Sequence, residues 1–170
     1  MTTPQTAPEI SPKAQAFRDG MSRLGAAVNI VTTDGPAGRH GLTVSAVCSV
    51  TDTPPTLLVC INKSSHAHNA FVENKVLCVN VLSPAHEELS RAFARWTGDD
   101  RFARTEWHSN GTGAPVLADA AVAFDCRIVE CQTRGTHTVF FCEVMATELA
   151  EGNTDGLVWF SRRFHPLLAS

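Results

Sequence analysis

Hydrophobic and polar residues alternate along several stretches of the chain, and a period of two predicts β-strands. The clearest alternation covers residues 42–51, with one interruption at Val47. It predicts a single half-buried antiparallel strand with an apolar face and a hydroxyl-bearing face. The apolar face comprises Leu42, Val44, Ala46, Cys48 and Val50, and the hydroxyl face comprises Thr43, Ser45, Ser49 and Thr51.

Other apolar runs of strand length lie on either side of this segment. Pro54 and Pro55 predict a turn that pairs residues 42–51 with the next strand as a hairpin. The further predicted strands cover residues 26–33, 56–61, 76–82, 121–129, 138–149 and 156–164.

Three stretches instead carry signals for helices. Ser11 followed by Pro12 predicts a helix start, because Ser is a favoured N-cap and Pro is favoured in the first turn. A short helix over residues 66–73 would be capped by Ser64 or Ser65. Ser83 and Pro84 open a third helix, whose apolar stripe comprises Leu89, Ala92, Phe93 and Trp96.

These elements indicate a mainly β protein of six or seven strands, joined mostly by short turns, with two or three short helices. Strands and helices do not alternate strictly, which argues against a doubly wound sheet, and a closed or nearly closed barrel would leave few exposed edges. Residues 1–12 are predicted to form a flexible tail and residues 13–170 a single domain. Residues 97–114 show little periodicity and are predicted to be a long surface excursion.

Composition and charge narrow the classes of protein to consider. A formal net charge of −3 gives no basic field for nucleic acid or for an anionic membrane. The apolar runs are too short to span a membrane, and the amino end lacks the apolar middle of a signal peptide, which predicts a cytoplasmic protein. The six cysteines form no CxxC pair, so zinc and thioredoxin chemistry lack their spacing, and most are predicted to be small core residues.

A cluster of hydrogen-bonding groups follows the strand 56–61, where a helix is predicted to begin. It comprises Asn62, Lys63, Ser64, Ser65, His66, His68 and Asn69. A helix start, two hydroxyls and a cation suit a phosphate group, with the hydroxyl face of residues 43–49 one hairpin away. The alternative is an ordinary helix cap beside a solvated lysine. His66 and His68 could ligate a metal, but no third ligand is identifiable, so no metal site is predicted.

Two later clusters also combine cations with imidazoles. Residues 134–137, with the sequence RGTH, lie between two predicted strands, and residues 161–166, with the sequence SRRFHP, end the last strand. Either could be a ligand site, or simply a polar turn and a solvated chain end. The chain has no P-loop, G-x-G-x-x-G or G-x-S-x-G motif, so any nucleotide would be held without a Rossmann unit.

Several motifs together resemble the short-chain flavin reductases of two-component aromatic monooxygenases, such as the reductase of 4-hydroxyphenylacetate 3-monooxygenase and those of chlorophenol monooxygenases. The resemblance runs from about Phe17 to Pro166. It is carried by AAVNIVTT, GLTVSAVCSVTDTPPTLLVCIN, LCVNVL, GTHTVFFCEV and DGLVWFSRRFHP. It implies an FMN-binding split β-barrel of antiparallel, Greek-key type. It also implies a homodimer that reduces FAD or FMN with NADH and supplies the reduced flavin by diffusion to a separate aromatic-hydroxylating oxygenase.

The resemblance also implies which residues bind. The flavin ring and ribityl chain would contact the segment 43–50, and the phosphate end would reach residues 62–66. The implied flavin-binding residues are Thr43, Val44, Ser45, Ala46, Ser49, Val50, Cys60, Asn62, Lys63, Ser64, Ser65, His66 and Asn69. The implied NADH-binding residues are Arg134, Gly135, Thr136, His137 and His165. No residue is assigned a proton-transfer role; His137 would position the nicotinamide.

Two other functions remain open from the sequence. The same barrel could serve as a flavin carrier or sensor with no enzymatic activity. It could also reduce another acceptor, such as a ferric complex or the peroxyamino acid formed in pyrimidine breakdown.

Overall fold

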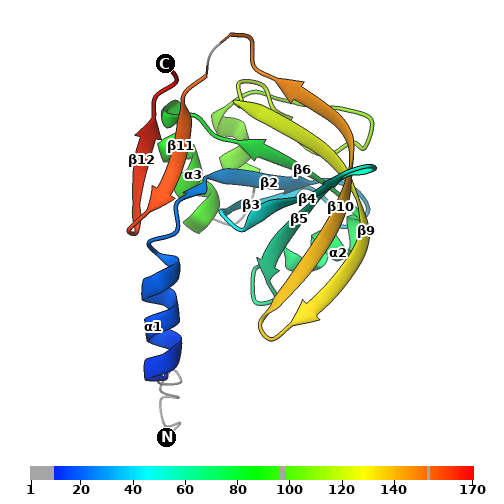
Figure 1. Cartoon of the computed structure of the whole chain (residues 1–170). Coiled ribbons are helices and arrows are strands. Elements are labelled where there is room, and N and C mark those ends of the chain that lie inside the picture. The colour runs from blue at the N-terminus through cyan, green and yellow to red at the C-terminus, as the bar shows by residue number, and fades with distance from the viewer. Residues whose placement is uncertain (1–9, 96–98, 153) are drawn as a thin grey trace, which may run out of the picture.

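The computed structural model describes residues 10–95, 99–152 and 154–170. Its largest unit is a seven-stranded antiparallel sheet in the order β3-β2-β6-β9-β10-β5-β4 (Figure 1). The strands are β2 (Asn29–Thr33), β3 (His40–Val44), β4 (Val47–Asp52), β5 (Pro55–Asn62), β6 (Val76–Val81), β9 (Val122–Arg134) and β10 (His137–Leu149).

Two smaller sheets and three α-helices complete the described part of the chain. The order β1-β11-β12 joins β1 (Ala26–Ala27) to a C-terminal hairpin, and β7 pairs with β8. The remaining elements are α1 (Pro12–Met21), α2 (His68–Asn74), η1 (Pro84–His86), α3 (Glu87–Arg95), η2 (Asp99–Arg104), β7 (Trp107–Ser109), β8 (Pro115–Leu117), β11 (Gly156–Phe160) and β12 (Arg163–Leu167). The predicted mainly β split-barrel class with a few short helices is confirmed.

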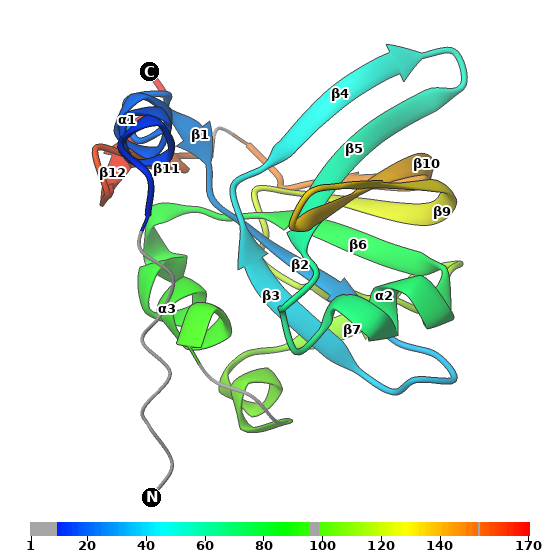
Figure 2. The ribbon, with the colours of Figure 1, turned by 90° about the horizontal axis from the view of Figure 1, so that it is seen from below.

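The chain passes directly between the two edges of the large sheet at Ser45 and Ala46. Strand β3 lies at one edge and β4 at the other, so the connection brings the edges together. The backbone amide of Cys60 donates to the carbonyl of Ala46 at 3.0 Å, which ties the connection to β5. This crossing closes the sheet into a barrel, and Figure 2 shows β4 and the paired end of β5 extending away from it.

The prediction of one strand over residues 42–51 is therefore wrong. Beyond the break, β4 has no buried residue, and Val50 is 48% exposed. Alternation of residue types cannot reveal that a chain changes sheet edge, because both halves keep a period of two. The last predicted strand, 156–164, is likewise a hairpin that turns at Ser161 and Arg162, both with positive φ.

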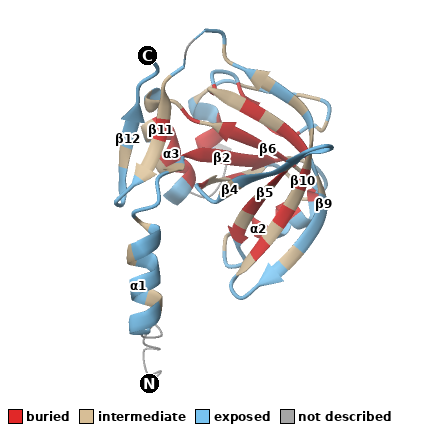
Figure 3. Cartoon of the chain, in the orientation of Figure 1, coloured by how far each residue is buried: buried red, intermediate tan, exposed pale blue. Residues whose placement is uncertain are grey.

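Two apolar clusters lie on opposite sides of the sheet, and β2 is buried along its whole length because it separates them (Figure 3). Val31 points into the barrel cluster, which includes Phe71 and Phe140, and its neighbour Ile30 points into the outer cluster under α3. Three cysteines are buried as predicted (Cys78, Cys126 and Cys142), whereas Cys48 and Cys131 are exposed and Cys60 is half-buried.

The segment 97–114 is the predicted surface excursion only in part, since most of its described residues are exposed or half-buried but some pack into the core. It contains η2 and β7, and Arg101 and Phe102 are buried against the outer cluster. Trp96, predicted on the α3 stripe, and residues 1–9 of the predicted tail lie outside the described residues. The predicted N-cap at Ser11 is confirmed: its hydroxyl accepts a hydrogen bond from the amide of Ala14.

Candidate functional site

A cleft of about 1090 Å³ lies between α1 and the β3–β4 connection. One wall of the cleft is formed by the β3–β4 connection and the adjacent part of β5. This wall carries Ser45, Ala46 and Cys60. The opposite wall is α1, which buries none of its residues and turns apolar side chains toward the cleft. The apolar lining comprises Phe17, Met21, Leu24, Ala26, Ala27, Val47, Leu58 and Trp159.

A second recess of about 240 Å³ adjoins the cleft, because both are lined by Ser45 and Trp159. It lies between β3 and α3, where the hydroxyl of Thr43 donates to the carbonyl of Ser90 at 2.6 Å. Within the described part of the chain the buried Ser90 hydroxyl has no hydrogen-bond partner. The recess therefore holds one polar group whose hydrogen-bonding capacity is unused.

The cleft and recess carry cations at their rims and no carboxylate among their described lining residues. Arg18 and Arg162 line the cleft, and Arg91 and Arg95 line the recess. Arg162 also pairs with Asp19 on α1, and this guanidinium lowers the pKa of the Asp19 carboxyl. An apolar floor with a cationic rim suits a planar aromatic ligand that carries a phosphate.

The hydrogen-bonding cluster after β5 forms a turn, which corrects the predicted helix cap. The side-chain oxygen of Asn62 accepts from the amide and the hydroxyl of Ser64, and the amide of Ser65 donates to the Asn62 carbonyl. Because this turn comes first, α2 begins at His68 with Ala67 as its N-cap and no side-chain cap. The predicted caps, Ser64 and Ser65, therefore lie before the helix rather than at its first turn.

The turn at residues 62–65 lies against the predicted nicotinamide turn. In the β5–β10 ladder Asn62 is paired with His137, and the amide of Lys63 donates to the carbonyl of Thr136 at 2.9 Å. Gly135 has a φ of +56°, which allows the tight reversal between β9 and β10. The Thr136 hydroxyl and Nδ1 of His137 are 2.9 Å apart. The structure thus brings together two clusters that are about 70 residues apart in the sequence.

His66 and His68 have different partners and point to different surroundings. Nε2 of His66 lies 3.1 Å from a terminal nitrogen of Arg101, and its ring lies 6.5 Å from that of His40. Burial, the Arg101 cation and His40 together lower the pKa of His66. His68 is bonded to the Thr138 hydroxyl and to the side-chain oxygen of Asn69. No group of three or more potential metal ligands occurs among the described residues.

Three residues implied by the resemblance, Ser49, Val50 and His165, lie apart from this arrangement. Ser49 is paired with Leu57, five residues and about 17 Å along β5 from Asn62. Val50 follows it on the exposed strand β4. In the separate β11–β12 sheet, His165 lies 3.2 Å from the carbonyl of Phe160. Within this chain, His165 therefore does not join the turn at residues 135–137. Arg134, in contrast, is paired with His137 in the β9–β10 ladder, although its guanidinium donates to the side chain of Gln132 on its own strand.

Val44, the remaining implied flavin-binding residue of β3, is buried in the barrel core. The cleft also uses residues that were not among the implied binding residues, among them Arg18, Trp159 and Arg162. Arg18 lies on the predicted first helix, and its position beside Phe17 and Met21 was the one signal available. Arg162 was part of the SRRFHP cluster, but without the hairpin turn its direction could not be derived.

Comparison with known proteins identifies the family. Residues 21–168 match the model of the flavin reductase like domain. The chain belongs to this flavin reductase family. The family predicted from the sequence is confirmed, and the match covers both the cleft-forming connection and the turn at residues 135–137.

Relatives of this flavin reductase share its whole domain. It is 59% identical over 161 residues to FMN reductase (NADH) RutF of Ancylobacter novellus, covering 94% of this chain and 87% of the relative. It is 54% identical to FMN reductase (NADH) RutF of Escherichia coli K12, covering 91% of this chain and 94% of the relative.

Solved structures agree with the fold. A flavin reductase structure from Haemophilus somnus has a TM-score of 0.86 at 44% identity, covering 89% of this chain and 97% of that one. The NADH:FAD oxidoreductase SgcE6 of Streptomyces globisporus, solved with NAD and FAD fragments, has a TM-score of 0.83 at 27% identity, covering 94% and 96% of the two chains. No helix among the described residues is long and apolar enough to cross a membrane.

Proposed function

We propose that this protein reduces FMN with NADH and releases the reduced flavin to a separate flavin-dependent oxygenase. The observation that carries the proposal is the cleft. Its lining is mostly apolar, Arg18 and Arg162 lie at its rim, and one wall is the connection at Ser45 and Ala46 that joins the two edges of the large sheet. We propose FMN and not FAD as the flavin, because the relatives at 50–59% identity are named FMN reductase (NADH). NADH is preferred over NADPH for the same reason.

The ring system of FMN would lie in the cleft, against the backbone of Ser45 and Ala46 and beside Cys60. Its phosphate would reach the turn at residues 62–65, since Cys60 lies two residues before Asn62 on β5. The nicotinamide would lie toward Thr136 and His137, whose turn contacts Lys63. When both nucleotides are bound they supply the chemistry, a hydride transfer from the nicotinamide to the flavin.

The protein contributes position and environment rather than proton transfer. The cleft walls would exclude water from the rings, and the ladder between β5 and β10 fixes the distance between the two nucleotide-binding turns. The arginine rim would stabilise the negative charge that develops as the flavin is reduced.

We also propose that the active species is a homodimer. Helix α1 projects from the barrel (Figure 1), buries none of its residues, and leaves Phe17 67% exposed beside the cleft. A second copy that packs on α1 would cover this apolar face and close the open side of the cleft.

The relatives, which are named FMN reductase (NADH) RutF, do not support the aromatic-hydroxylating partner expected from the sequence, so we propose only an oxygenase that takes reduced FMN. BorF, a structure of 27% identity and TM-score 0.84, is by its name the flavin reductase component of a two-component tryptophan halogenase. A reductase of this fold can therefore serve partners of more than one kind, and delivery by diffusion would require no dedicated docking surface.

The test is loss of absorbance at 340 nm when NADH is mixed with the protein and FMN, with FAD and with NADPH as comparisons. We expect fastest turnover with FMN and NADH. Tight flavin binding with no NADH oxidation would instead support the carrier, and oxidation that needs a ferric complex would support the other reductase. Ala46→Trp, which would fill the cleft, should reduce turnover at least about tenfold, whereas Thr51→Trp on exposed β4 should not.

A further inference from the structure

A buried arginine supports the exposed loop that would take the flavin phosphate. Arg101 of η2 is 1% exposed, and its guanidinium carbon lies 5.1 Å from the ring centre of Phe93 and 5.8 Å from that of Phe102. A planar cation that packs against two aromatic rings, which are themselves perpendicular to each other, is restricted in its orientation. One of its terminal nitrogens lies 3.1 Å from Nε2 of His66.

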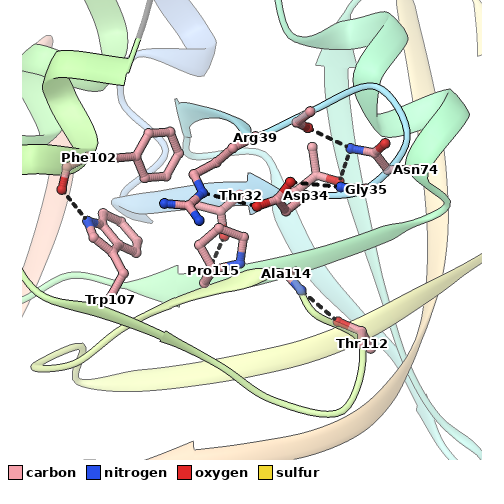
Figure 4. A network of polar contacts seen from close by, with 12 residues as sticks. Thr32, Asp34, Gly35, Arg39, Asn74, Phe102, Trp107, Thr112, Ala114 and Pro115 are labelled. Atoms are coloured by element: carbon pink, nitrogen blue, oxygen red, sulfur yellow. Dashed lines mark hydrogen bonds and ion pairs between the residues drawn. The ribbon is translucent and has the colours of Figure 1, made fainter.

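The short helix that carries Arg101 is itself anchored on two sides (Figure 4). The indole of Trp107 donates to the carbonyl of Phe102 at 3.0 Å. Arg39, which is ion-paired with Asp34, lies 5.6 Å from the centre of the Phe102 ring. Arg101 therefore approaches His66 from a rigid support, whereas His66 lies on an exposed turn.

The chemistry of the contact decides where the imidazole proton lies. A guanidinium carries only donors, so Nε2 of His66 must accept. A neutral imidazole that accepts at Nε2 carries its proton on Nδ1, and an imidazolium would place two donors against each other. Within the described part of the chain, Nδ1 has no hydrogen-bond partner.

We propose that Arg101 is a positioning residue of the flavin-phosphate turn, which holds His66 as the Nδ1–H tautomer so that it offers one fixed donor to the phosphate of FMN. The inference rests on the proposed function. It adds to that function a residue from the segment 97–114 that would act through His66.

The surroundings of His66 agree with a neutral ring. The titratable groups that act on it from the packed elements are Arg101 of η2 and His40 of β3, and both oppose a further positive charge. Together with burial they lower the pKa of His66 from its ordinary value of 6.5. In the intact protein the ring should therefore stay neutral across the physiological range.

The first test uses the unmodified protein. Nitrogen-15 NMR of labelled histidine reports the tautomer directly, with His66 assigned by its absence from the His66→Ala spectrum. We expect the Nδ1–H form at pH 7 and a titration midpoint below 6.5. An Nε2–H form, or an imidazolium at pH 7, would overturn the proposal.

The second test compares FMN with riboflavin, which lacks the phosphate, in the variant Arg101→Met between pH 6 and 8. At pH 8 we expect FMN affinity to fall at least about tenfold, the value of one charge-assisted hydrogen bond, and riboflavin affinity to change less than about twofold. As the pH falls the released His66 should protonate and restore FMN binding. The FMN phosphate titrates near pH 6 with both proteins. The ratio of the FMN affinity of the variant to that of the wild type therefore reports the protonation of His66 and not that of the phosphate.

Two further variants separate positioning from a general structural effect. His66→Ala should lose the same FMN affinity without the recovery at low pH, and adding Arg101→Met to it should cost nothing more. Equal losses for FMN and riboflavin in Arg101→Met would overturn the positioning role. If the wild-type protein binds no flavin at all, the proposed function itself fails; if it binds FMN and the ratio does not move, only the Arg101 inference fails.

Discussion

His137 occupies the junction of the two nucleotide-binding turns and is partly exposed at the start of β10. If it holds the nicotinamide nucleotide and takes no proton, His137→Ala should raise the KM for NADH about fivefold, the value of one hydrogen bond of about 1 kcal/mol, with a smaller change in the KM for FMN. Steady-state kinetics with each substrate varied in turn measure both constants.

His165→Ala is the matched comparison, because His165 lies in the separate β11–β12 sheet. We expect a change of less than about twofold in either KM for a side chain outside the site. Equal increases in the two Michaelis constants for His137→Ala would contradict its assigned role, and an effect of His165→Ala as large as that of His137→Ala would place His165 in the site.

The buried thiol of Cys126 should make the free energy of unfolding depend on pH in the alkaline range. Burial, followed by the nearby Asp125 carboxylate, raises the pKa of this thiol from 9.0 to about 12. Since the folded state disfavours the thiolate, the stabilising contribution is complete below pH 9 and is lost as the pH rises to about 12. Over that range Cys126→Ala should flatten the pH dependence of the unfolding free energy by about 1.4 kcal/mol per pH unit.

Urea unfolding at several pH values from 8 to 11 measures this slope. The chain contains no tyrosine, so phenol groups do not add their own alkaline titration. Cys48→Ala, at an exposed thiol, is the control and should leave the slope close to that of the wild type. An identical slope for wild type and Cys126→Ala would show that the buried thiol does not titrate between the two states.

Among elements, the packing of α3 on β3 shapes the recess beside the cleft. A Cβ atom at Gly41 would lie 2.9 Å from the ring of Phe93 and 3.2 Å from the carbonyl of Val31. Gly41→Ala should therefore displace α3, cost about 1–3 kcal/mol of unfolding free energy, and weaken FMN binding. Thermal unfolding and flavin titration measure the two effects.

Gly20→Ala is the comparison for Gly41→Ala, and it should not lower the free energy of unfolding. Gly20 lies near the end of α1, and a Cβ atom there would meet nothing within 4 Å. Ala favours a helix over Gly by about 1 kcal/mol, so this variant should be as stable as the wild type or more stable. Loss of stability in Gly20→Ala, or none in Gly41→Ala, would contradict the packing described for α1 and α3.

The type of most elements, helix or strand, could be predicted from local sequence patterns. Where each element ends and which strand it pairs with could not. The strand at residues 76–82 and the hairpin at Pro54 were predictable because period and turn residues are local properties. The break at Ser45 was not, because β3 and β4 keep the same alternation on opposite sheet edges. The helix cap predicted at Ser64 or Ser65 was wrong for a similar reason. Asn62 forms an Asx-type turn there, and such a turn uses the same residue types as an N-cap.

The candidate site shows the same division. The turn at residues 62–65 was predictable as a polar cluster after a strand, and its contact with Thr136 required the β5–β10 ladder. Arg101 could not be found from the sequence, because nothing in an aperiodic segment signals that a cation will be buried against Phe93 and Phe102. Residues whose role depends on long-range packing are those that local patterns omit.

At the scale of the whole molecule, one protomer leaves the cleft open along α1. The helix contributes apolar side chains to the cleft wall but packs none of them in the barrel, and the pair of Arg162 with Asp19 ties it to the β11–β12 turn. A helix with an exposed apolar face is unfavourable in water unless another surface covers it. Dimerisation and flavin binding should therefore depend on the same side chains.

Phe17→Glu tests this coupling, since it places a charge where the apolar contact with a second copy is expected. We expect a shift from dimer to monomer in light scattering at micromolar concentration, together with at least about tenfold weaker FMN binding, because a charge at a buried apolar contact costs several kcal/mol. The barrel should remain folded, since Phe17 is 67% exposed in one protomer. Ala16→Glu, an exposed neighbour that does not line the cleft, is the matched control and should remain dimeric. A monomeric wild type with full turnover would contradict the coupling, and a dimeric Phe17→Glu variant would place the interface elsewhere on the barrel.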